Sequence, residues 1–123
     1  MPIEEHFNKI KQGVDVWNQW REENLSQAYI RGSQLRKIKL SNTDLNEAKL
    51  QYSNLTGATL EKANLNKAKL LETNLQSANL KDANLSGAGL LESNLQFADL
   101  ENANLEGAQF NEGTIFNQTN LKG

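Results

Sequence analysis

An apolar residue recurs at every fifth position of this chain, from Leu25 to Phe110, without interruption. The 18 positions of this column hold 16 Leu together with Ile30 and Phe110. Two residues before them, the 17 positions from Ala28 to Ala108 hold 11 Ala, five Ser or Thr and one Ile. A period of five fits neither a helix, at 3.6 residues, nor a long strand, at two. The chain must therefore turn at regular intervals.

The small residue and the Leu of each unit are two positions apart, so their side chains point to the same face of a short extended segment. That face is the expected interior of an all-β solenoid. A slower period gives the size of a coil, because Ser33, Ser53, Thr73 and Ser93 recur every 20 residues, as does the Leu70-Leu71 pair at Leu90-Leu91. Four units therefore make one coil. About five coils at a strand spacing of about 4.8 Å predict a rod about 25 Å long.

The repeated unit Ala-Asn-Leu-x-x, from Leu25 to about Leu121, resembles the pentapeptide-repeat family. The run Lys-Gln-Gly-Val-Asp-Val-Trp-Asn-Gln-Trp-Arg at Lys11 to Arg21 is similar to the leader of members of cyanobacterial type. The resemblance implies a right-handed quadrilateral β-helix, with four five-residue sides per turn, over residues 25–123. It also implies the role presumed for most members, which is a scaffold or interaction module.

The register of the repeat slips near the C-terminus, where Phe116 follows Phe110 after six residues and Leu121 follows after five more. The extra residue is most simply Gly113, since glycine suits a bulge or a special corner. The sequence leaves open whether Gly113 marks a bulge or ends the regular coil. Phe116 and Leu121 lie near an uncapped end and are candidates for an end-to-end contact between two copies; fraying and a cap by the last residues are the alternatives.

Residues 1–24 are expected to form an amphipathic capping α-helix that covers the open strand edges of the first coil. Its apolar stripe follows steps of four, three, four and three residues, at Ile3, Phe7, Ile10, Val14 and Trp17. A helix that binds a membrane surface or a partner is the alternative. Glu4 and Glu5 stand where a signal peptide needs basic residues, and the chain has no Cys. We therefore expect a cytoplasmic protein without disulfides.

Catalysis is not expected, because no acid, base, nucleophile and metal-ligand set converges in the sequence. The Ser33, Ser53, Thr73 and Ser93 side chains point inward and should bond to the backbone or to one another. His6 is the only histidine and has no evident partner residue. We predict a protein that is not an enzyme, with no catalytic, cofactor-binding or metal-binding residues and no cofactor.

An outward apolar strip is the most distinctive surface feature. Leu71 and Leu91 each follow an inward Leu, Tyr52 lies one coil earlier, and Phe97 is expected on a neighbouring side. Such a strip is a candidate partner-binding surface. The remaining outward columns are interpreted as structural: an Asn ladder at Asn64, Asn84 and Asn104, and a self-compensating charged column at Glu61, Lys81 and Glu101.

Charge divides the solenoid into two halves, since residues 25–70 carry a net charge of +5 and residues 71–123 one of −5. Glu72, Glu92 and Glu112 stack on the acidic half. This column is expected to be solvated, and a loosely held cation is the alternative.

The function predicted from the sequence is a non-enzymatic scaffold that binds an unidentified protein partner and neither nucleic acid nor membrane, with a possible homodimer through the C-terminal end. The alternative is a DNA mimic that inhibits an enzyme such as gyrase, which the resemblance attributes to quinolone-resistance members of the family. A strongly negative rod suits that activity, whereas this chain has a net charge of −2.

Overall fold

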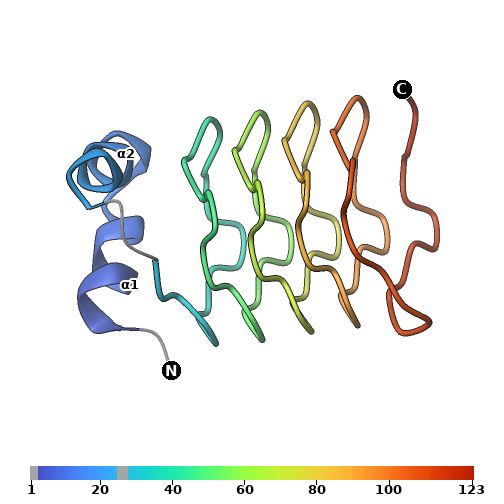
Figure 1. The fold of residues 1–123 in the computed structure, drawn as a ribbon, viewed down its shortest axis with the longest axis horizontal. Coiled ribbons are helices and arrows are strands. Elements are labelled where there is room, and N and C mark those ends of the chain that lie inside the picture. The colour runs from blue at the N-terminus through green and yellow to red at the C-terminus, as the bar shows by residue number, and fades with distance from the viewer. Residues whose placement is uncertain (1–2, 25–27) are drawn as a thin grey trace.

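Two short helices precede a stack of coils that forms a rod (Figure 1). The computed structural model describes residues 3–24 and 28–123, so the predicted first repeat position, Leu25, lies outside the described residues. Helix α1 spans Glu4–Lys11 and helix α2 spans Val14–Glu23. Neither described helix has the length and apolar content needed to cross a bilayer.

The sides of the coils pair through single β-bridges rather than through long strands. Among the described residues these bridges fall into four parallel ladders, which begin at Tyr29, Gln34, Lys39 and Asp44, and each step joins residues 20 positions apart as far as Gln109. The 20-residue period of the Ser/Thr and Leu-Leu pattern is therefore the pairing period of the backbone. Each bridge residue points outward, between an inward small residue and an inward Leu.

Each five-residue corner of a coil is a tight turn with one residue in the left-handed region. At the corner that begins with Leu35, the Ile38 N–H donates to the Leu35 carbonyl at 3.1 Å, and Lys37 has φ 59°. A positive φ at the third residue is the signature of a type II turn. The two variable positions of every unit are thus the two central residues of a turn.

The Asn residues before the Leu positions stabilise these corners. The side-chain carbonyls of Asn64, Asn84 and Asn104 each accept a hydrogen bond from the backbone N–H two residues later, at 3.1, 3.0 and 2.9 Å. These are local Asx-type bonds within one coil. The column is structural as predicted, and the bonds found for these three side chains are local, within one coil.

The interior is the predicted column of Leu lined by small residues. Inward positions from Ile30 to Leu100 are at most 2% exposed, except for Ile38, which is partly exposed at the helical end of the stack. Three of the predicted inward hydroxyls bond to the backbone: Ser53 Oγ and Thr73 Oγ1 donate to the carbonyls of Ile30 and Leu50, both at 2.9 Å, and Ser93 Oγ donates to the Leu70 carbonyl. The prediction is wrong for Ser33, whose Oγ is buried without a hydrogen-bond partner among the described residues. None of these hydroxyls is presented to solvent as a nucleophile.

The register slip is real, but Gly113 does not cause it. Ile115 and Asn120 pair with residues 21 positions earlier. Asn111 is the extra residue: its Oδ1 accepts the Glu92 N–H at 3.0 Å, where the preceding coil uses the Leu91 backbone carbonyl. Gly113 is not in the left-handed region, and a Cβ there would collide with the Glu92 carboxylate. The coil continues beyond this six-residue corner, so the slip does not end the stack.

The N-terminal segment is two helices, not the single continuous helix predicted. Gly13, with φ 110°, separates them in a backbone conformation that is accessible to glycine and costly for other residues. The apolar stripe nevertheless runs across the break, since Ile10 and Trp17 are both buried against the first coil.

The helices bond to the edge of the first coil through their side chains. Within the stack, the N–H of a bridge residue donates to the coil before it, as Asn64 does to the Thr43 carbonyl at 2.8 Å. In the first coil, the Asp44 N–H donates to Asn18 Oδ1 at 2.8 Å, and its carbonyl accepts the Trp17 Nε1–H at 2.7 Å.

Tyr29 is bonded in the same way. Its N–H donates to His6 Nδ1 at 2.9 Å, and its carbonyl accepts the Ile3 N–H at 3.0 Å. The helices thus replace a preceding coil along two of the four sides.

Candidate partner-binding surface

The predicted apolar strip lies along one corner of the rod. Leu71 and Leu91 are the first central residues of successive turns at this corner, and both are half-buried rather than fully projecting. Tyr52 is the second central residue of the preceding turn and is 50% exposed. Phe97, also 50% exposed, belongs to the next corner of the coil that contains Leu91. The structure therefore places three of the four residues on one corner and Phe97 across the adjoining side.

The backbone at Tyr52 and Phe97 is unusual for such large side chains. Their φ angles are 64° and 62°; the equivalent turn positions of other coils hold glycine at Gly32 and Gly57 and polar residues such as Glu72 and Ser77, also at left-handed φ. A left-handed conformation costs a bulky L-residue about 1–2 kcal/mol. Half of each ring is in solvent, so core packing does not account for the aromatic residues. The Tyr52 ring does lie 5.9 Å from the Arg31 guanidinium.

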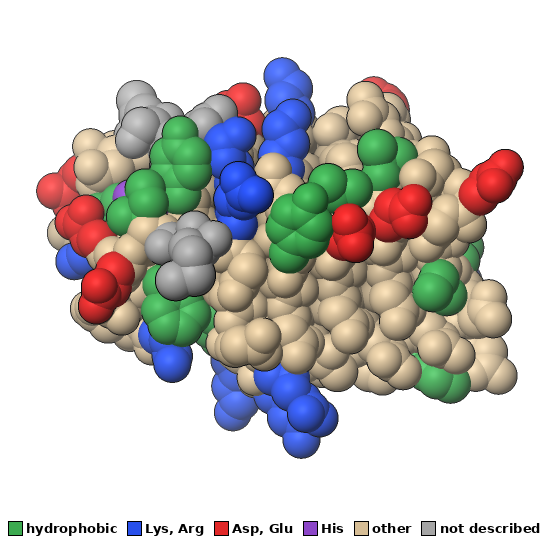
Figure 2. Space-filling model, turned by 90° about the horizontal axis from the view of Figure 1, so that it is seen from below, with side chains coloured by type: hydrophobic (Ala, Val, Ile, Leu, Met, Phe, Trp, Pro, Cys, Tyr) green, Lys and Arg blue, Asp and Glu red, His purple; other side chains and the backbone are tan. Residues whose placement is uncertain are grey.

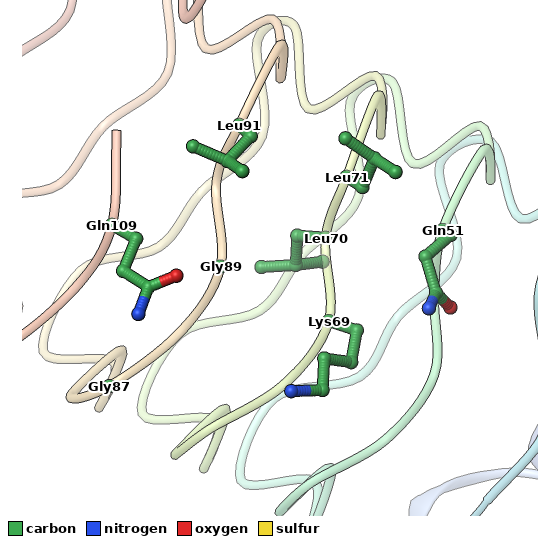
Figure 3. Close-up of a pocket in the computed structure, with 8 residues that line it drawn as sticks. All are labelled: Gln51, Lys69, Leu70, Leu71, Gly87, Gly89, Leu91 and Gln109. Atoms are coloured by element: carbon green, nitrogen blue, oxygen red, sulfur yellow. The ribbon is translucent and has the colours of Figure 1, made fainter. Parts of the chain in front are cut away.

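A recess of about 240 Å³ opens beside the strip (Figure 3). Leu71 and Leu91 line it on the corner side, Lys69 and Gln109 lie on either side of Gly89, and Gly87 lies at the opposite corner. Gln51 also lines the recess, and its Oε1 is buried without a hydrogen bond among the described residues. Two other hollows of similar volume lie on helix α2 and beside Ile38, away from the strip.

Charge changes from one end of the rod to the other. Past the helices, Figure 2 shows basic side chains first, then hydrophobic ones, then acidic ones. The predicted pairing in the charged column is confirmed for Lys81, whose Nζ lies 3.4 Å from Glu101 Oε1. The hydrogen bond to Glu101, together with its charge, raises the pKa of Lys81.

No metal-binding cluster of His, Cys, Asp or Glu forms within the described ranges. Glu72, Glu92 and Glu112 share the acidic side, but no group of three or more His, Cys, Asp or Glu side chains there could hold a metal ion. His6 is buried between Trp20 and Tyr29. Burial and the nearby Arg21 charge lower the pKa of His6, against an opposing effect of Glu5. This histidine accepts the Tyr29 N–H and so bonds helix α1 to the first coil.

The C-terminal end of the rod presents a second apolar surface. Of the two candidate residues for an end contact, Leu121 is 53% exposed, while Phe116 is partly buried with its ring 5.2 Å from that of Phe110. Phe110 and Ile115, which the sequence did not single out for this end, are 44% and 40% exposed. The inward column therefore reaches solvent at the last coil.

Sequence patterns missed two features of these surfaces. The first is the recess at Gly89. The available signal was a glycine at an outward position where the equivalent residues of other coils are Lys or Gln. His6 was thought to lack a partner, but it accepts the Tyr29 N–H. That bond joins residues 23 positions apart, which no local pattern reveals.

Comparison with known proteins gives a consistent result. The family model described as pentapeptide repeats matches residues 24–61, 53–90 and 78–123, with 8 copies. No curated protein matches the chain in sequence. A solved pentapeptide repeat protein from the Arabidopsis thaliana thylakoid lumen is similar at 32% identity and a TM-score of 0.72, over 73% of this chain and 62% of its own. The present chain thus spans less than two thirds of that protein.

Two cyanobacterial structures are also similar. A pentapeptide repeat protein from Cyanothece is 24% identical over 80% of this chain and 96% of its own, with a TM-score of 0.45. HetL from Nostoc, which is involved in the regulation of heterocyst differentiation, is 33% identical over 73% of this chain and 39% of its own, with a TM-score of 0.41.

Proposed function

Because this chain belongs to the pentapeptide repeat family, we propose that it is a non-enzymatic scaffold that binds a protein partner. The binding surface is the corner that carries Tyr52, Leu71 and Leu91, extended by Phe97. The observation that carries this proposal is the pair of half-exposed aromatic rings held at left-handed backbone positions. Aromatic side chains are enriched at the energetic centres of protein interfaces, and these two are exposed where the other non-glycine residues at left-handed turn positions are polar.

The architecture suits such a role. Each interior coil is hydrogen-bonded to the coil before and the coil after it, so the corner residues are presented in a fixed array. A preorganised surface loses little conformational entropy on binding. In the proposed arrangement the rod is a right-handed quadrilateral β-helix of about five coils, and helices α1 and α2 close one end. The cytoplasm is the proposed compartment.

Capture of partners with matched variants tests the proposal. The tagged wild type, the double variant Leu71→Asp/Leu91→Asp and the control Gln76→Asp/Gln96→Asp are used to capture proteins from native cytosol, and bound proteins are quantified by mass spectrometry. Gln76 and Gln96 occupy the same turn position at the next corner of the same coils, so the control adds the same charge.

A protein that the wild type and the control retain and the Leu variant loses is the expected result. Circular dichroism confirms that both variants fold. If the Leu variant captures every protein that the wild type captures, this corner is not the binding surface.

The same proposal includes a contact between copies at the C-terminal end. It is supported by the exposed side chains of Phe110, Ile115 and Leu121. Light scattering at high micromolar concentration is expected to show dimers of the wild type and monomers of Phe110→Ser/Leu121→Ser. A wild-type monomer at that concentration contradicts the contact.

A further inference from the structure

Gly89 stands where every other described bridge residue has a side chain. The equivalent positions of neighbouring coils are Lys49, Lys69 and Gln109, so the pattern of this ladder calls for a long polar residue. Glycine at an extended position costs conformational entropy and contributes no packing. Its presence at this one site needs a physical reason.

Neither the backbone nor the packing requires glycine here. Gly89 is not in the left-handed region, and a Cβ built on it would meet no atom within 4 Å. Gly87 differs, since its φ is 67° and a Cβ there would lie 3.2 Å from Lys67 Cγ. The remaining reason for glycine inside a strand position is the close approach of another molecule.

We propose that the recess at Gly89 receives one apolar side chain of the protein partner, with an acidic residue beside it in the partner sequence. This inference rests on the proposed scaffold function and specifies what the surface recognises. The recess of about 240 Å³ is smaller than most small-molecule sites, which begin near about 300 Å³, and its size suits a single large side chain. Leu71 and Leu91 supply the apolar wall against which that side chain packs.

The charges around the recess set the orientation of the partner. Lys69 lines it, Lys49 is its bridge neighbour one coil earlier, and Lys67 lies at the adjacent corner. Among the described residues, Lys81 and Glu101 form an ion pair, and Lys69 forms none. The Lys69 ammonium is therefore available to a carboxylate of the partner. Glu72 and Glu92 follow the two Leu residues in sequence and disfavour an acid at that end. The partner carboxylate therefore points to Lys69 and its apolar side chain to the Leu wall.

Titration with defined peptides, followed by amide chemical shifts, tests this inference. The probe is the capped peptide Gly-Ser-Glu-Leu-Ser-Ser-Gly at millimolar concentration; one control peptide has Ser in place of Leu, and the other has Gln in place of Glu. The probe is expected to shift the amide signals of Gly87, Gly89, Leu71 and Leu91. Both control peptides are expected to bind about tenfold more weakly.

Two protein variants locate the site. Gly89→Gln fills the recess with the residue of the next coil and is expected to abolish the shifts without loss of stability. Thr59→Gln introduces the same side chain on another face and is expected to bind as the wild type does. Lys69→Gln is expected to bind the Glu and Gln peptides equally.

The recess inference is overturned if the probe shifts no signals at the recess, or if its binding survives Gly89→Gln. Equal binding of the Glu and Gln peptides to the wild type overturns the acidic component. The two proposals also fail separately. If captured partners depend on Leu71 and Leu91 but bind Gly89→Gln as tightly as the wild type, the scaffold stands and the recess does not.

Discussion

The two ends of the rod differ in how their free backbone edges and the ends of the Leu column are covered. A coil in the middle has a neighbour on both sides, whereas each terminal coil has one free edge of backbone groups and one open end of the Leu column. At the helical end, Trp17, Asn18 and His6 supply the bonds that a preceding coil would make. At the other end, Phe110 and Leu121 remain about half exposed.

This difference distinguishes two requirements that a neighbouring coil meets together in the middle of the rod. One is burial of the Leu column, and the other is hydrogen bonding of the backbone edge. Burial of the Leu column needs only apolar side chains packed over its open end, and Ile10 and Trp17 provide them. Satisfaction of the edge needs donors and acceptors at fixed positions, which polar side chains of α1 and α2 provide. Among the described residues of the last coil, Phe110, Ile115 and Leu121 are exposed, and they form the surface used in the proposed contact between copies.

The largest contrast is expected between equivalent Leu residues in the middle and at the end of the rod. Leu65 is fully buried and Leu105, on the same side two coils later, is partly exposed. Leu65→Ala should lower the free energy of unfolding by about 2–5 kcal/mol through lost burial and a cavity. Leu105→Ala should cost clearly less, as measured by urea unfolding. Equal losses would mean that the last coil is covered in solution.

A smaller effect is expected at the helical end. Trp17→Phe keeps an aromatic ring in the core but removes the donor to the Asp44 carbonyl, which should cost about 1–3 kcal/mol. Hydrogen exchange should show the loss of protection mainly in the first coil. Phe116→Leu, at the opposite end, serves as the control and should leave first-coil exchange unchanged.

The pH dependence of the free energy of unfolding tests the contribution of His6 at the helical end. Unfolded His6 titrates near 6.5, and burial lowers its pKa in the folded protein. Between these two values the unfolded state binds more protons, so stability is full above pH 6.5 and falls as the pH drops through the folded pKa.

His6→Gln keeps an acceptor near the Tyr29 N–H and should remove this component of the pH dependence, with an effect below that of Trp17→Phe. Urea unfolding between pH 5 and 8 measures it. An unchanged pH profile in the variant would show that other groups cause the dependence.

The smallest expected effect concerns the contrast between the basic and acidic halves. A DNA mimic needs a continuous negative surface, but the net charge is +5 over residues 25–70. We expect no change in gyrase supercoiling at low micromolar protein. Strong inhibition at that concentration would favour the DNA-mimic alternative over the scaffold.

The regular part of this fold was predictable because an apolar residue recurs at every fifth position. The Leu column and the inward Ser53 and Thr73 follow directly from that period. The break at Gly13 did not, because the apolar stripe continues from Ile10 to Trp17 across it. A glycine in the middle of a helical stripe was the available signal.

The candidate surface was only partly predictable for a related reason. Leu71 and Leu91 were visible as side chains, and their outward direction followed from the period. The recess beside them depends on a missing side chain at Gly89, and its walls come from four successive coils. The six-residue corner is similar: only the bond from Glu92 to the Asn111 side chain identifies the extra residue.

The pairing of each coil only with its immediate neighbours has a mechanical consequence. Bridges join residues 20 positions apart, or 21 beyond the slip, and the bridges recorded skip no coil. A pulling force on the C-terminus therefore meets one coil at a time, and each release frees about 70 Å of extended chain. In a force–extension experiment the coils should unfold one after another, with nearly equal gains in extension. The coil bonded to Trp17 and Asn18 should unfold last.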